Sequence, residues 1–112
     1  MIGGNTTARF ERGLPVQNAI GEDVLSWSPV GSLYGWLDMQ ESSSGVGYTA
    51  YNAAIAESTH VFLADYDATI AALHPELCRA IVDGKIYDVL MIDDPMGMHR
   101  QLEVYLKYTG GQ

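Results

Sequence analysis

A chain of 112 residues with 47% apolar and 18% charged residues has the size and composition of one globular domain, so we expect a single ordered domain over residues 1–112. The formal net charge of −8 at pH 7 argues against proteins that hold nucleic acid, because their affinity comes from Lys and Arg that displace counterions from phosphates. Cys78 is the single cysteine, which excludes an internal disulfide, and no apolar run is long enough to span a membrane.

The N-terminal third predicts an arm, a hairpin and a further strand. Residues 1–8 combine glycines with small polar residues, and we expect them to form a flexible arm. Apolar residues alternate with polar ones over 9–18, and the short run 23–27 follows a turn, so this pair predicts a hairpin. Pro29 is expected to end or bend that run, which makes residues 30–40 a separate strand.

Residues 41–56 interrupt this pattern with a serine- and glycine-rich segment that also holds two tyrosines. Such a composition buries little surface and is costly to order, so it predicts one long flexible loop. A long structureless connection in a compact domain is often functional, and we take this loop as the candidate contact with a partner or a channel. The candidate residues are Ser42, Ser43, Ser44, Gly45, Val46, Gly47, Tyr48 and Tyr51.

The segment after the loop predicts a strand and a short helix. Residues 57–66 alternate as a strand with a buried face, and we expect them to pair with residues 33–39. Asp67 is placed to cap a helix, which Pro75 limits to about two turns.

The last third predicts a meander of three strands over residues 79–108. Asp83-Gly84 favours a type I′ turn between the first two strands, and residues 93–97 supply a Pro and a Gly for the next reversal. In the middle strand, Val89 and Met91 are expected on one face. In the last strand the predicted buried face is Leu102, Val104, Leu106 and Tyr108, and the predicted wet face is Gln101, Glu103, Tyr105 and Lys107. Together the strands predict an all-β fold, a small β-barrel or sandwich of about six antiparallel strands with one long loop and a short helix.

No motif in the chain predicts catalysis, a metal site or a cofactor. His60, His74 and His99 lack the spacing of a known ligand set with Asp93 or Asp94. The two aspartates precede a proline, where Asp commonly stabilises turns. The serine cluster has no nucleophile elbow and no patterned histidine base. We therefore expect no enzyme activity.

The aromatic residues are assigned to packing and interfaces, with Trp27, Trp36 and Tyr87 as the candidate packing anchors. Stacking on single-stranded bases is less favoured, because the basic groove that accompanies it is missing. A small barrel that binds a ligand or a partner protein, similar to an OB-fold module, remains the alternative function.

In this order and spacing, the segments resemble the tailed-phage head–tail joining proteins, also called head closure, stopper or head–tail adaptor proteins. The resembling segments are Ser26–Val30, Leu33–Asp38, the loop 42–56, Glu57–Tyr66, the hairpin Val82–Ile92, the turn Asp94-Pro95 and Leu102–Leu106. The family often has an arginine in the fourth of these segments, where this chain has Ala64-Asp65-Tyr66.

The resemblance implies a structural protein of the virion, made in the host cytoplasm and placed at the head–tail interface. It implies a monomer in isolation that forms a homo-oligomeric ring on assembly, with a portal or adaptor ring above it and a tail-end protein below. DNA would pass through the channel without specific binding, no membrane would be involved, and the ring would help to retain packaged DNA. The loop 41–56 would project toward the channel or the adjacent ring.

Overall fold

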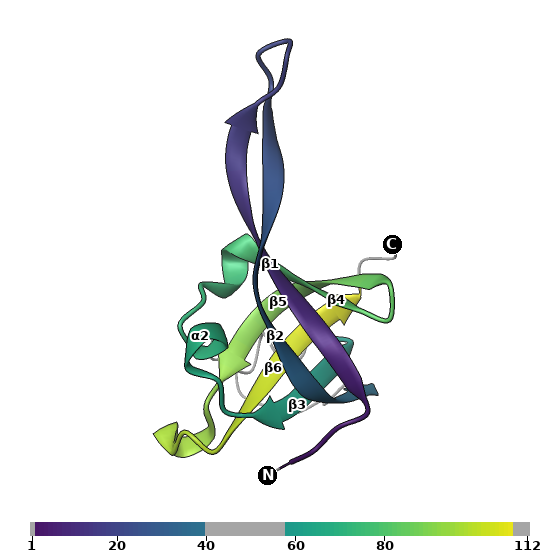
Figure 1. The fold of residues 1–112 in the computed structure, drawn as a ribbon, viewed down its shortest axis with the longest axis vertical. Coiled ribbons are helices and arrows are strands. Elements are labelled where there is room, and N and C mark those ends of the chain that lie inside the picture. The colour runs from purple at the N-terminus through teal and green to yellow at the C-terminus, as the bar shows by residue number, and fades with distance from the viewer. Residues whose placement is uncertain (1, 40–57, 109–112) are drawn as a thin grey trace, which may run out of the picture.

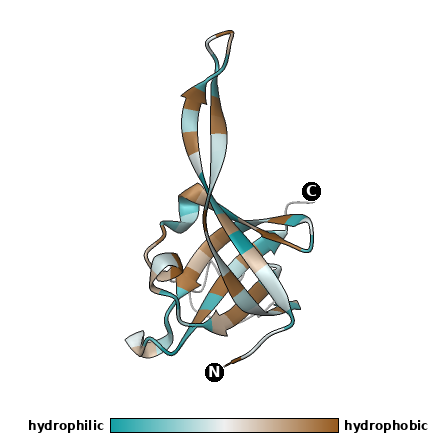
Figure 2. Cartoon of the chain, in the orientation of Figure 1, coloured by the Kyte–Doolittle hydropathy of each residue, from teal (hydrophilic) through white to brown (hydrophobic). Residues whose placement is uncertain are grey.

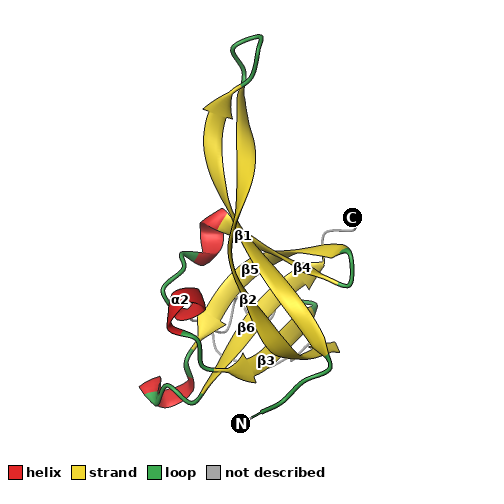
Figure 3. Cartoon of the chain, viewed as in Figure 1, coloured by secondary structure: helices red, strands yellow, loops and turns green. Residues whose placement is uncertain are grey.

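The computed structural model describes residues 2–39 and 58–108, which form a closed barrel of six antiparallel strands. The strands are β1 (Thr6–Gln17), β2 (Asp23–Met39), β3 (His60–Asp65), β4 (Cys78–Val82), β5 (Lys85–Asp93) and β6 (Gln101–Tyr108). They are ordered β1-β2-β3-β6-β5-β4 around the barrel, and the pairing of β1 with β4 closes it (Figures 1 and 3). The predicted all-β fold of six antiparallel strands is confirmed, and it is a barrel rather than a sandwich.

The barrel is filled by side chains from alternate positions of all six strands. Those with no more than 1% of their surface exposed are Ala8, Phe10, Phe62, Ala64, Ala80, Val82, Leu102, Val104 and Leu106, joined by Ile70 from the helix. The prediction that Tyr105 is exposed to solvent was wrong. Its side chain lies on the outer face of the last strand, yet only 6% of the residue is exposed. Tyr108, predicted to be buried, is 38% exposed because it lies at the end of the barrel.

The C-terminal meander forms with the predicted turns. Asp83 and Gly84 have φ angles of 52° and 78°, as a type I′ turn requires. The middle strand differs from strict alternation, because a bulge between Val89 and Met91 shifts the register against β6. As a result Ile92, and not Met91, shares the core-facing side with Val89.

The N-terminal strands are longer than predicted. β1 begins at Thr6, so residues 6–8 of the predicted arm lie in the barrel, with Ala8 fully buried. Pro29 does not end a strand either. The chain continues as one strand of 17 residues, because a register shift leaves Val30 unpaired opposite the Phe10–Glu11 step and absorbs the irregularity.

The short helix α2 (Ala68–Ala71) packs over the barrel wall beside β2 (Figure 1). Asp67 caps it as predicted, with Oδ1 accepting from the backbone N–H of Thr69 at 2.9 Å and of Ile70 at 3.1 Å. The helix is only four residues long, shorter than the predicted two turns, and the chain passes into the 3-10 turn η1 (Pro75–Leu77). A second 3-10 turn, η2 (Pro95–Gly97), joins β5 to β6. No helix in the described ranges is both long enough and apolar enough to cross a membrane.

Replacing Phe62 with alanine should lower the free energy of unfolding by about 3–5 kcal/mol, because this ring is fully buried in the barrel. Urea unfolding followed by fluorescence measures the loss. Tyr34→Ala is the matched control, since Tyr34 is an aromatic residue that is 60% exposed on the outer wall. Equal losses for the two variants would contradict the assignment of the core.

Candidate assembly interface

Two strands of the barrel run on beyond their neighbours and form a projecting hairpin, residues 13–27. β4 pairs with β1 only as far as Arg12, and β3 pairs with β2 only from Gly35 onward. Beyond these points β1 and β2 pair with each other alone, so the ribbon extends away from the barrel (Figure 1). The molecule measures 46 Å along its longest axis, which runs toward the hairpin tip.

The tip of the projecting hairpin is an ordered turn. The side-chain Oδ1 of Asn18 accepts from the backbone N–H of Ile20 at 3.0 Å and of Glu22 at 2.9 Å. The backbone N–H of Asn18 donates to the carbonyl oxygen of Glu22 at 2.8 Å, and Gly21 supplies the positive φ of 86° that the reversal requires. Ile20 stands at this turn with 78% of its surface exposed.

Both faces of the projecting hairpin carry exposed apolar side chains. Figure 2 shows that apolar residues occur along both of its strands. Directly paired residues share a face, so Leu14 lies with Val16 and Val24 on one side, whereas Leu25 lies on the other. Each of these four is between 43% and 54% exposed. A ribbon whose apolar side chains are left exposed by the described residues is a candidate surface for binding another molecule.

The base of the projecting hairpin is fixed to the barrel by a clamp of four residues. The guanidinium of Arg79 lies 4.1 Å from the centroid of the Trp27 ring, and its Nε donates to Glu11 Oε1 at 2.8 Å. Gly13 faces the same indole ring, and a Cβ at this position would lie 3.1 Å from two ring carbons. The clamp therefore joins both strands of the hairpin to β4 and sets the direction in which the ribbon leaves the barrel.

The residues predicted from sequence lie in different places. Ser42–Gly47, Tyr48 and Tyr51 lie outside the described residues. Trp27 is the centre of the clamp. Trp36 is 41% exposed on the barrel wall, where its Nε1 donates to the carbonyl oxygen of Ile2 at 3.3 Å. Tyr87 is 3% exposed, with its ring edge-on to His60 at 5.1 Å between centroids.

A hollow of about 340 Å³ lies on the barrel wall below α2 and is lined by Gly3, Ser32, Leu33, Tyr34, Ala64, Asp65, Tyr66 and Asp67. Its two carboxylates have structural partners. Asp65 Oδ1 accepts from the backbone N–H of Ile2 at 2.6 Å, and Asp67 caps the helix. The hollow therefore presents no carboxylate arranged for acid–base chemistry.

The other side chains that could bind a metal or act as nucleophiles in the described residues also show no reactive arrangement. Within residues 2–39 and 58–108, no cluster of three or more His, Cys, Asp or Glu side chains is placed to hold a metal ion. Cys78 is buried, and burial raises the pKa of its thiol, which disfavours the reactive thiolate. Burial, with a smaller effect of the Lys85 charge, lowers the pKa of His60.

Sequence reasoning did not identify the exposed apolar faces of the projecting hairpin. The available signal was that Val24 and Leu25 are adjacent and must face opposite sides of a strand. Apolar residues on both faces ordinarily indicate a strand covered on both sides. Only the pairing limits of β3 and β4 show that no other part of the described chain supplies that cover.

A family model described as phage head completion protein matches residues 4–107 of the chain. Among solved structures, a chain of a native gene transfer agent virion particle is 15% identical, with a TM-score of 0.56 and 91% of each chain covered. A solution structure of a protein from Shigella flexneri 2a is 13% identical, with a TM-score of 0.67 over 100% of this chain and 98% of that one. At these identities the two structures show the fold alone. No curated protein matches the chain.

Replacing Arg79 with glutamine should loosen the projecting hairpin at a cost of about 1 kcal/mol, because it removes both the cation–π contact and the ion pair. Amide hydrogen exchange should accelerate in residues 13–27 and stay unchanged in β6. Arg9→Gln is the control, since Arg9 is exposed on β1 and forms no ion pair with any described residue. Unchanged exchange in the hairpin of Arg79→Gln would show that the clamp does not hold it.

Proposed function

Because the chain belongs to the phage head completion protein family, we propose that it forms a ring between the portal or adaptor ring and the tail, joins head to tail and helps to retain packaged DNA. Membership of this family supports a structural role in the virion rather than an enzymatic one. Formation of a ring, its neighbours in the virion and its part in DNA retention are our proposals, and they go beyond what family membership alone gives.

The observation that supports assembly is the projecting hairpin, whose two faces carry apolar side chains that the described residues leave exposed. A two-stranded ribbon has little stability in water, because it cannot bury its own side chains. In a ring, every copy has a neighbour on each side, so a ribbon that enters the contact between copies becomes covered. The isolated chain lacks these neighbours, which agrees with a monomer that assembles only on docking.

The charge of the chain fits a wall along which DNA moves. With a formal net charge of −8, the protein has few groups that could hold phosphates, and long-range repulsion keeps the polymer from adhering. Retention of DNA would then be steric and would depend on which segment narrows the channel.

The segment we propose for that task is the serine- and glycine-rich stretch 41–56. It follows β2 after Met39, at the end of that strand opposite the projecting hairpin. One end of β2 thus serves contacts between copies, and the chain beyond its other end is available to the channel or to the adjacent ring.

Electron microscopy of the purified chain mixed with its portal or adaptor protein and its tail-end protein tests the proposed position. We expect ring-shaped density of this chain between the other two, and separate monomers when the chain is imaged alone. The chain mixed with an unrelated ring-forming protein is the control. Failure to associate with either partner would contradict the proposal.

Deletion of residues 43–47 should leave the barrel folded and head–tail joining intact but should lower the fraction of particles that retain DNA. The comparison is Val46→Ser, which keeps the length of the segment. DNA content of purified particles and their infectivity provide the measurement. Full, infectious particles from the deletion variant would show that this segment does not retain DNA.

A further inference from the structure

The turn η2 forms an exposed corner, residues 94–100, that is held rigidly although it lies at the surface. Asp94 Oδ1 accepts from the backbone N–H of His99 at 3.0 Å, and Oδ2 contacts His99 Nδ1 at 2.5 Å. The His99 ring packs against Tyr66 with 4.5 Å between centroids. The backbone N–H of Tyr66 also donates to the carbonyl oxygen of Arg100 at 3.2 Å, which joins the corner to the residue that follows β3.

This corner holds Met96 in a left-handed backbone conformation, which is costly for a residue with a side chain. Met96 has a φ of 58° and is 91% exposed, and Met98 is 49% exposed. The left-handed region disfavours residues with a Cβ, and glycine or asparagine is the usual occupant. Strained backbone of this kind that holds an apolar side chain in solvent is a feature of functional surfaces.

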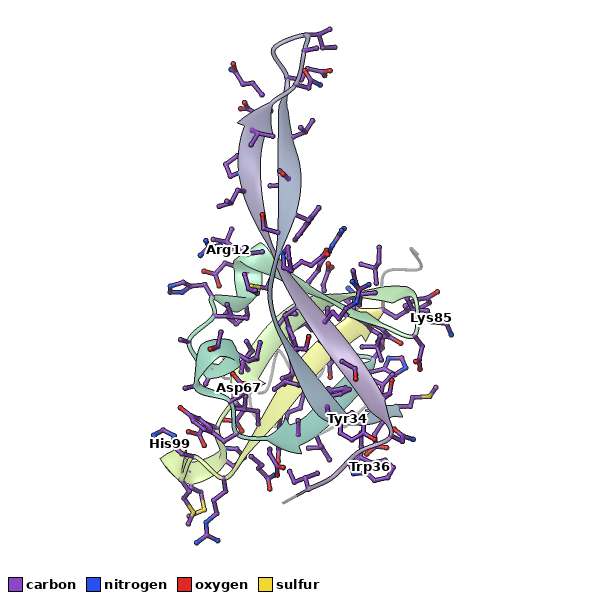
Figure 4. The ribbon with its side chains drawn as sticks, viewed as in Figure 1. Arg12, Tyr34, Trp36, Asp67, Lys85 and His99 are labelled. Carbon is purple, nitrogen blue, oxygen red and sulfur yellow. The ribbon has the colours of Figure 1, made fainter. Side chains whose placement is uncertain are left out.

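The corner and the hairpin tip lie at opposite ends of the molecule. Figure 1 shows η2 at the end of the barrel away from the hairpin, and Figure 4 shows His99 at that end. One copy therefore cannot cover its own corner with its own hairpin. A second copy, oriented head to tail, can do so.

The two surfaces complement each other in polarity and charge. The tip carries Ile20 beside the carboxylates of Glu22 and Asp23. The corner carries flexible methionines, which adapt to an inserted apolar side chain, and the guanidinium of Arg100, which forms no ion pair with any acid of the described chain.

We propose that the hairpin tip of one copy docks on the η2 corner of the next copy, with Ile20 against Met96 and Met98 and the acidic residues of the tip toward Arg100. The contact joins two different surfaces, so it is heterologous and repeats from copy to copy, and it closes into a ring when the rotation between copies is suitable. This inference rests on the proposed ring and names the surfaces that build it.

Cysteine crosslinking in assembled particles tests the contact. The doubly substituted chain Ile20→Cys with Met96→Cys is supplied together with wild-type chain, so that particle assembly does not depend on the variant. After mild oxidation of purified particles we expect disulfide-linked dimers and longer ladders of this chain on non-reducing gels. The native Cys78 is buried and should remain unlinked.

The matched control is the chain with Ile20→Cys and Met39→Cys, because Met39 is 78% exposed, the same fraction as Ile20, and lies at the far end of β2. We expect no ladder from it. A ladder from the control in place of the Met96 pair would overturn the proposed contact. Absence of the chain from wild-type particles would overturn the proposed function as well, whereas its presence without a Met96 ladder overturns only this contact.

A second variant separates docking from folding. Met96→Gly removes the exposed side chain and relieves the left-handed backbone, so the thermal unfolding midpoint should stay close to that of the wild type. In competition with wild-type chain, its incorporation into particles should fall by about tenfold, the usual loss for an anchor residue of an interface. Met39→Ala should be incorporated normally. Equal incorporation of Met96→Gly and wild-type chain would contradict the proposal.

Discussion

The unequal lengths of the strands determine the shape of this protein. β1 has 12 residues and β2 has 17, whereas β4 has 5 and β3 has 6. The neighbours end where the closed barrel ends, so among the described strands the remaining lengths of β1 and β2 pair only with each other. A closed barrel has no free edge, and the projecting hairpin restores two of them outside it. The element that we propose for assembly thus arises directly from the difference in strand length.

A ribbon of this kind would be poorly directed without the clamp at its base. Backbone pairing between two strands leaves a ribbon free to twist and bend, because the usual cover on its faces is missing. Trp27 lies across Gly13 and beneath the Arg79 guanidinium, and Arg79 is paired with Glu11 on β1. These contacts cross three strands and transfer the rigidity of the barrel to the first residues of the ribbon. The tip is then presented in a defined direction at little entropic cost on binding.

The parts of the fold that local chemistry determines were predictable from the sequence. Asp83-Gly84 and the Asp67 cap require only residues next to each other in the chain, and both formed as expected. The continuation of β2 through Pro29 was not predictable, because it depends on a bulge opposite β1. The register shift between Val89 and Met91 was not predictable either, because it depends on the pairing of β5 with β6. In each case the partner strand decides the register, and the residues of one strand alone contain no information on it.

The candidate interface was harder to predict for a related reason. Leu14, Val16 and Val24 have the alternation of an ordinary half-buried strand, and they are exposed because no opposite barrel wall among the described residues covers their face. A ribbon with two free edges also invites indiscriminate strand pairing. Pro15 on β1 has no backbone N–H to offer an added strand, which weakens that edge of the ribbon. Recognition is thereby shifted from the backbone edges to the side chains of the two faces, where shape and charge can select one partner.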